Sequence, residues 1–169
     1  MAKSTDIQLL ETTGSTEYIA YRAPIKFGGR VVTDVVLLNV ACRVQTRGGR
    51  SGVGSGSMPM GNVWAWPSNT VPTETTLSAM VEFGKRFVAE ANGYRGWGHP
   101  LEITHELSAA MARIAAEVQT ALALAEPMPK LAQLVAASPV MAAIYDAYGK
   151  ALGENSYNLL GLEYVNADM

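Results

Sequence analysis

Few residues of this chain carry reactive chemistry, and they do not form a catalytic set. The candidates are Cys42, His99, His105, Asp146 and Lys150. Cys42 lies in an apolar segment without a partner motif, which favours a buried structural thiol over a nucleophile. His99 precedes the predicted helix that carries His105, so the two imidazoles do not share a helix face, and a capping or surface role is favoured over metal ligation. Asp146 and Lys150 are four residues apart with the acid first, which is typical of a solvated helical pair. We therefore predict no catalytic residue and no metal site in this chain.

A glycine cluster, GVGSGS at residues 52–57, has part of the spacing of a dinucleotide-binding fingerprint. Ser57 stands where the third glycine belongs, and Pro59 interrupts the chain where a fingerprint would open a helix. We interpret the cluster instead as a strand whose close packing excludes side chains.

Residues 54–69, GSGSMPMGNVWAWPSN, place two tryptophans on a glycine-led segment that fits no helix or strand period in its second half. Loops run over the surface, where a large indole is expected to pack against the protein or to bind something. Trp64 and Trp66 alternate in phase, so in an extended segment they point in opposite directions. One indole is therefore expected to cover the core and the other to be free for binding.

Length and composition indicate the number of domains and exclude several classes of protein. The 169 residues are 49% hydrophobic and 17% charged, which indicates one globular domain. The net charge of -2 and the absence of a basic block argue against nucleic-acid binding. The single cysteine excludes an internal disulfide, and neither a signal peptide nor a membrane-spanning run is recognisable. We expect a cytoplasmic protein without membrane contact.

The first part of the chain is predicted to be an antiparallel β-meander. A short first strand is expected around Ile7 and Leu9, and residues 31–44, VVTDVVLLNVACRV, are the strongest strand signal. In that strand the predicted core face consists of Leu38, Val40, Cys42 and Val44. Residues 47–50, RGGR, predict a hairpin turn, and residues 51–57 predict the returning strand.

The second part is predicted to be helical, giving an α+β fold: a three-stranded meander followed by a bundle of three to four helices. Apolar periodicity and breakers predict helices over residues 73–92 and 100–122, a short helix with Leu131 and Leu134, and a last helix from Ser138-Pro139 to Gly153.

Residues 138–161, SPVMAAIYDAYGKALGENSYNLLG, resemble the end of the N-terminal capping domain of the enolase superfamily, in the mandelate racemase and muconate lactonizing branch. The matching positions are Ala142, Asp146, Gly149, Lys150, Gly153, Leu159, Leu160 and Gly161; Ser156 replaces a frequent proline. RAPIKFGGRVVTDVVLLNV, residues 22–40, resembles the first mobile loop and second strand of that domain. The resemblance implies a capping domain over residues 1–161, with residues 162–169 beginning the linker to a catalytic barrel.

In that family the barrel carries the chemistry. A Lys or His base removes the proton α to a carboxylate, and Mg²⁺ stabilises the product of that step. The resemblance therefore implies no cofactor in this chain and Mg²⁺ in the intact enzyme, which would be a racemase, epimerase, cycloisomerase or sugar-acid dehydratase. The implied partners are the barrel, as a domain or a separate chain, a carboxylate or sugar-acid substrate, and further copies in a homo-oligomer.

The resemblance also implies that two loops close over the barrel and select the substrate. They correspond here to residues 23–30 and 57–68. The implied substrate-binding residues are Lys26, Phe27, Met60, Asn62, Trp64 and Trp66. Gly28, Gly29 and Gly61 are the expected hinges. The alternative is a free-standing, non-catalytic binding or interaction module with the same fold.

Overall fold

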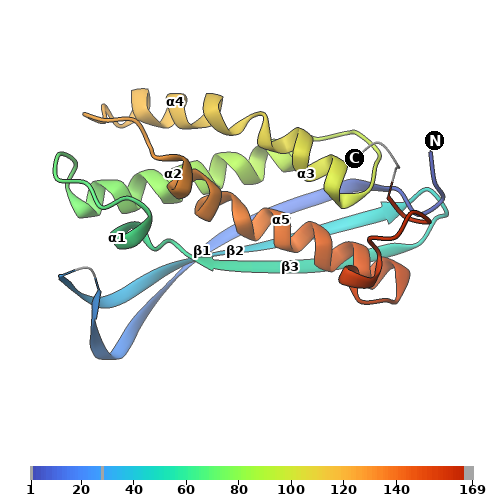
Figure 1. Ribbon diagram of the computed structural model, residues 1–169, viewed down its shortest axis with the longest axis horizontal. Coiled ribbons are helices and arrows are strands. Elements are labelled where there is room, and N and C mark those ends of the chain that lie inside the picture. The colour runs from blue at the N-terminus through green and yellow to red at the C-terminus, as the bar shows by residue number, and fades with distance from the viewer. Residues whose placement is uncertain (1, 28, 166–169) are drawn as a thin grey trace.

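The computed structural model describes residues 2–27 and 29–165 and shows a three-stranded antiparallel sheet with helices on one face (Figure 1). The strands, adjacent in sequence order, are β1 (Ile7–Phe27), β2 (Arg30–Thr46) and β3 (Ser51–Pro59). The helices are α1 (Asn62–Ala65), α2 (Thr73–Gly93), α3 (Pro100–Ser108), α4 (Met111–Ala121) and α5 (Lys130–Leu152), followed by the 3-10 turn η1 (Ser156–Asn158). The predicted α+β meander with about four helices is confirmed. Among the described residues, no helix has both the length and the apolar character that crossing a membrane requires.

The core lies between the sheet and the helices α2 and α5, and α4 covers the far side of α2 (Figure 1). The predicted inward face of β2 is confirmed, because Leu38, Val40, Cys42 and Val44 are all buried. Opposite them, Phe83 and Phe87 of α2 stack with ring centroids 6.1 Å apart. The apolar side chains that alternate along β2 thus face the apolar side of α2, and the core forms between them.

The glycine cluster of β3 is the contact surface for α5. A Cβ atom on Gly52, Gly54 or Gly56 would overlap the main chain of α5. The facing residues of that helix are Pro139, Ala143, Ala147 and Ala151. Two residues along a strand cover about 6.7 Å and four along a helix about 6.0 Å, so glycines spaced by two stay in step with small residues spaced by four. The interpretation of this cluster as close packing is confirmed.

The expectation of a short first strand is wrong. β1 runs for 21 residues and pairs with β2 almost to the tip of a long hairpin. Between the pairs Ala20↔Asp34 and Ile25↔Val32, residues 21–24 of β1 face only Thr33 of β2. This bulge contains Pro24, which has no N–H to donate, and a bulge bends the strand that carries it. The outer part of the hairpin folds back toward α1 beyond the bend (Figure 1).

Two helix predictions are also wrong in their boundaries. The predicted helix over residues 100–122 is divided into α3 and α4 at Ala109 and Ala110. Next to the division, the Ser108 hydroxyl donates to the carbonyl oxygen of His105 at 2.6 Å, a local bond that competes with the helical ladder.

The second correction joins two predicted helices into one. α5 is continuous from Lys130 to Leu152 and contains Pro139. Proline removes the N–H that would bond to the carbonyl four residues earlier, which is that of Val135. The Ser138 hydroxyl donates to this same oxygen at 2.8 Å, so the carbonyl remains bonded and the helix continues. Ser138 therefore replaces the hydrogen bond that Pro139 removes inside α5, although the sequence Ser-Pro is typical of a helix start.

The N-terminal residues and the last described residues lie together, at the end of the sheet opposite the hairpin tip (Figure 1). The ammonium group of Lys3 donates to the carbonyl oxygens of Leu162 and Val165, each at 2.6 Å. Leu159 and Val165 are buried there, whereas Tyr157, Leu160 and Leu162 are exposed. The apolar C-terminal segment is thus partly packed against its own domain.

Candidate functional site

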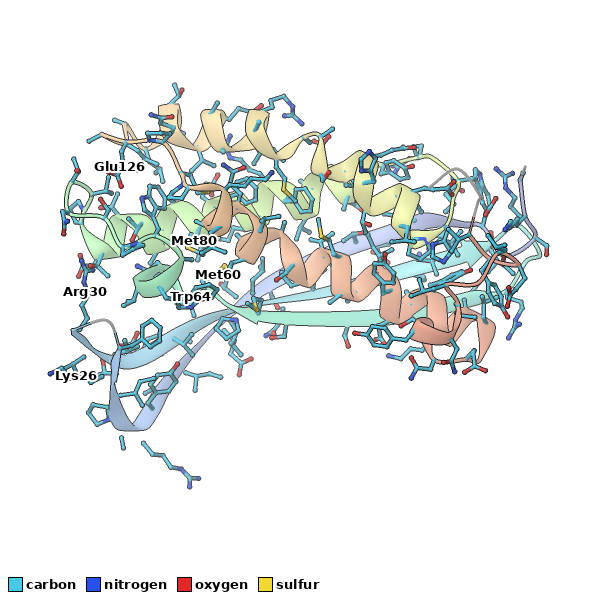
Figure 2. All side chains as sticks on the ribbon, viewed as in Figure 1. Lys26, Arg30, Met60, Trp64, Met80 and Glu126 are labelled. Carbon is cyan, nitrogen blue, oxygen red and sulfur yellow. The ribbon has the colours of Figure 1, made fainter. Side chains whose placement is uncertain are left out.

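The folded-back hairpin and the segment after β3 enclose a cavity of about 560 Å³. Ile25, Phe27 and Val31 of the hairpin line it on one side, and Met60 and Trp64 line it on the other, with Leu77 of α2 behind them. The cavity therefore lies between the two segments that the resemblance implies to be lid loops, residues 23–30 and 57–68. Figure 2 shows the labelled Met60 and Trp64 beside the point where the hairpin leaves the sheet.

The second lid segment is not a loop throughout. Ser57, Met58 and Pro59 end β3, and residues 62–65 form the short helix α1. The main-chain N–H of Met60 donates to the carbonyl of Val36 at 2.8 Å, which attaches the start of the segment to β2. The Met60 side chain is buried, with its exposed fraction at 2%.

Trp64 is partly exposed and lies against a glycine. Its indole lies so close over Gly61 that a Cβ atom there would overlap the ring. The exposed fraction of Trp64 is 42%, and its ring lines the cavity. Gly61, expected as a hinge, therefore also leaves the space that the indole of Trp64 occupies.

Trp66 lies in the core and does not line the cavity. Its Nε1–H donates to Glu126 Oε1 at 2.7 Å. Hydrogen bonds from Ser68 and Trp66 hold the pKa of the Glu126 carboxyl below its usual value. The two indoles do separate into one buried and one exposed. Trp64 lies in the short helix α1 and Trp66 follows its end, so the extended phase on which the expectation was based does not apply.

Asn62 lines the cavity, yet its amide group is engaged inside the protein. Nδ2 donates to the carbonyl of Thr73 at 2.7 Å and to the hydroxyl of Thr76 at 2.9 Å. These bonds connect α1 to the first turn of α2, so the polar end of Asn62 fixes the orientation of the short helix that carries Trp64.

Of the two hairpin residues expected to bind substrate, one lines the cavity and the other does not. Phe27 lines the cavity and is half exposed, whereas Lys26 is exposed and is not among the lining residues. Figure 2 shows Lys26 on the outer side of the hairpin tip. Of the residues expected as a mobile loop, 23–27 and 30 belong to strands and Gly29 has a left-handed φ of 79°, whereas Gly28, expected as a hinge, lies outside the described residues.

Sequence reasoning missed Arg30, which attaches the hairpin to the helical layer. Its guanidinium donates from Nη1 to the hydroxyl of Thr73 and from Nη2 to the carbonyl of Ser68 at 3.3 Å. Ser68 in turn is held because its hydroxyl accepts from the main-chain N–H groups of Thr70 and Val71. The signal in the sequence is weak: an arginine directly after a glycine pair does not reveal which distant segment it will reach.

His99, one of the residues considered for chemistry, has a structural role. His99 is fully buried at the start of α3 and forms a capping box with Glu102. Its Nδ1 accepts from the N–H of Leu101 at 3.1 Å, so Nε2 carries the proton and donates to the carbonyl of Leu159 at 2.9 Å. Burial lowers the pKa of His99 and keeps the imidazole neutral. The predicted capping role is confirmed.

Cys42 and the pair Asp146 and Lys150 are equally unsuited to catalysis. Burial raises the pKa of the Cys42 thiol, which disfavours the reactive thiolate. Asp146 Oδ2 accepts from Lys150 Nζ at 2.7 Å and from the N–H of Ser55 at 2.8 Å, on the protein surface. Within residues 2–27 and 29–165, no group of three or more His, Cys, Asp or Glu side chains could hold a metal ion.

Comparison with known proteins gives matches in structure only. No protein-family model matches the sequence, and no curated protein matches it. A mutant L-talarate/galactarate dehydratase liganded with Mg and L-glucarate is 17% identical, and the match covers 93% of this chain and 34% of that chain, with a TM-score of 0.54. The L-talarate/galactarate dehydratase from Salmonella typhimurium LT2 gives 17% identity, the same coverages and a TM-score of 0.49. An enolase from Bradyrhizobium complexed with magnesium and mandelic acid is 20% identical, with coverages of 92% and 35% and a TM-score of 0.46.

This chain thus spans about a third of the length of the solved structures it matches. The match with a TM-score of 0.54 shows a shared fold. The fold of this chain is therefore that of about a third of the L-talarate/galactarate dehydratase chain.

Proposed function

We propose that this chain is the substrate-capping domain of an enzyme that abstracts a proton α to a carboxylate. The observation that carries the proposal is the cavity between the hairpin and the β3–α1 segment, in a chain with the capping-domain fold. A domain that closes over a reaction centre needs apolar bulk to exclude water and a segment able to move. Half-exposed Phe27 and Trp64 provide such bulk at the cavity.

In this proposal the chemistry belongs to a barrel, present either as a further domain or as a partner chain. The base and Mg²⁺ would be held there, because the described residues of this chain offer no set of metal ligands. No step of the reaction is assigned to residues of this chain. Their proposed work is to bind the part of the substrate remote from the reacting carbon and to keep water out.

The six implied residues divide by position. Phe27, Met60 and Trp64 are proposed to contact substrate as cavity walls. Asn62 and Trp66 are proposed to act through others, since their polar groups are bonded within the protein. Lys26, exposed outside the cavity, is proposed to attract an anionic substrate during its approach.

The exposed Tyr157, Leu160 and Leu162 are the proposed contact with the barrel or with a second copy of the chain. They form part of the segment that follows α5, which in this proposal leads to the barrel. Exposed apolar residues close together mark interaction surfaces more often than isolated ones do.

The test is deuterium exchange at the α-carbon of a panel of 2-hydroxy acids, followed by NMR with Mg²⁺ present. It compares the chain alone with the native assembly, purified from its own source through a tag on this chain. We expect exchange by the assembly and none by the chain alone. Exchange by the isolated chain, or an assembly that exchanges no acid of the panel, would contradict the proposal.

A free-standing binding module is the second candidate. The observation in its favour is that residues of β1, β2, α1 and α2 together form a cavity of about 560 Å³, in the range of small-molecule sites. A native polypeptide of the mass of this chain alone, purifying without a barrel, would favour this candidate.

A further inference from the structure

We propose that the cavity receives an uncharged apolar group, aromatic or branched aliphatic, and disfavours a polyhydroxylated diacid such as galactarate. This inference rests on the proposed function in one respect only: the group is taken to be the remote end of the enzyme's substrate. The argument depends on the walls of the cavity, its charges and the surroundings of its polar groups.

The walls are mainly apolar although they face solvent. Ile25, Phe27, Val31 and Trp64 line the cavity with exposed fractions of 51%, 50%, 66% and 42%. Leaving four large apolar side chains exposed around one hollow costs hydrophobic free energy that an apolar occupant would recover. The volume of about 560 Å³ is in the range of small-molecule sites, and aromatic walls from both sides can stack on a flat or branched group.

The charges of the cavity have one sign. Its charged lining residues are Asp34 and Glu74. Among the described residues, neither carboxylate has an ion pair; Asp34 accepts only a hydrogen bond from the hydroxyl of its neighbour Thr33 at 2.9 Å. A substrate carboxylate placed here would meet two like charges and no cation.

The nearby cations and amide donors either bond within the protein or lie outside the cavity lining. The guanidinium of Arg30 bonds to Thr73 and Ser68 and is not part of the lining. Lys26 is outside the lining, and the amide nitrogen of Asn62 bonds to Thr73 and Thr76. A chain of hydroxyls would therefore lose its water with few donors to replace it, which is unfavourable.

The experiment is ligand titration of the isolated chain, followed by methyl and tryptophan NMR signals. The probes are 2-phenylethanol, which is neutral and aromatic, and galactarate, which is a hydroxylated diacid. We expect 2-phenylethanol to shift the methyl signals of Ile25, Val36 and Leu77 with a Kd on the order of 1–10 mM, as for a ligand of its size. Galactarate should bind at least about tenfold more weakly.

Three variants locate the effect. Trp64→Ala should weaken 2-phenylethanol binding about fivefold or more, since one stacking wall is lost. Trp97→Ala is the matched control, because Trp97 is also partly exposed but stacks under Arg47 and does not line the cavity. It should leave binding unchanged within a factor of two. Leu77→Ala repeats the test from the α2 wall in case Trp64→Ala is poorly folded.

A fourth variant, Asp34→Asn, tests the charge. Phenylacetate should bind about threefold more weakly than 2-phenylethanol, because its carboxylate enters a hydrated site whose charged residues, Asp34 and Glu74, have the same sign. Asp34→Asn should narrow this ratio, because it should strengthen the binding of phenylacetate more than that of 2-phenylethanol. An unchanged ratio would remove the electrostatic part of the inference.

The inference is overturned if galactarate binds as tightly as 2-phenylethanol, or if 2-phenylethanol does not shift these methyl signals in a folded sample. Failure of the proposed function is a separate result, because it is read from α-proton exchange by the native assembly. Exchange by the assembly without aromatic binding contradicts the inference alone. Aromatic binding without exchange contradicts the proposed function alone.

Discussion

Arg30, the first residue of β2, donates from Nη2 to the main-chain carbonyl of Ser68, 3.3 Å away, in the connection between α1 and α2. A second bond from Nη1 reaches Thr73 Oγ1, so one guanidinium joins the tip of the hairpin to the start of α2. A two-stranded ribbon is only marginally stable by itself in water. This attachment therefore determines how firmly the hairpin lies over the cavity.

Replacing Arg30 should loosen the hairpin without unfolding the domain. In Arg30→Ala we expect the amides of Ile25 and Val32, which face each other across the ribbon, to exchange hydrogen several times faster. Arg30→Lys should have a smaller but similar effect, since an ammonium lacks the planar fork that reaches two acceptors. The control is Arg22→Ala, because the described residues give Arg22 no hydrogen bond or ion pair. Equal exchange in Arg30→Ala and wild type would show that the attachment does not hold the hairpin.

Adding a methyl group at Gly54 should strongly destabilise the domain. The new Cβ would overlap the main chain of α5 at Ala143 and Ala147, which cannot rotate aside as a side chain can. We expect Gly54→Ala to cost about 3 kcal/mol of unfolding free energy, the upper part of the usual range for overpacking. Chemical denaturation measures it. Ser55→Ala is the control, since its side chain is exposed and its N–H still reaches Asp146; it should change stability by about 0.5 kcal/mol or less.

The two tryptophans of the β3–α1 segment should respond in opposite ways to truncation. Trp66→Ala should cost about 3–5 kcal/mol of stability, because it empties a core position with an exposed fraction of 2%. Trp64→Ala should cost on the order of 0.5–1 kcal/mol. In the native assembly its effect should fall on kcat/KM, as for a residue that contacts substrate. A large stability loss in Trp64→Ala with unchanged kinetics would show that Trp64 serves the core.

Stability should fall as the pH is lowered through the titration of His99. Burial keeps the folded-state pKa of His99 below the ordinary value of 6.5, so below that pH the unfolded chain binds more protons than the folded one. Stabilisation by neutral His99 is therefore fully present above pH 6.5 and is lost as the pH falls toward the folded-state pKa. Denaturation at pH 7.5 and pH 5.5 measures this difference while most carboxylates stay ionised.

Variants at both histidines assign that pH dependence. His99→Asn keeps a capping side chain at the start of α3 but cannot titrate, so the loss of stability between the two pH values should shrink. His105→Gln should leave it unchanged, because His105 is exposed on α3. A full pH dependence in His99→Asn would assign it to another group.

The amino-acid sequence by itself determined the parts of the fold that depend on local pattern. Val-rich alternation predicted the core face of β2 at Leu38, Val40, Cys42 and Val44, because neighbouring side chains of a strand point to opposite faces whatever lies around them. The RGGR turn and the α2 boundaries followed from glycine and from helical period for the same reason. The glycines of β3 indicated close packing, although not that α5 would be the helix packed against them.

Tertiary structure decided the features that depend on a distant partner. Pro139 stays inside α5 because the Ser138 hydroxyl takes the place of a lost N–H and Gly54 and Gly56 leave room for the helix beside it. The N–H of buried Trp66 has a partner because Glu126, 60 residues away, accepts it, and the indole of Trp64 occupies the space that Gly61 leaves open. The cavity exists because the bulge at residues 21–24 bends the hairpin back over the β3–α1 segment. Which residue a side chain meets depends on the path of the whole chain, and a local period carries no information about that path.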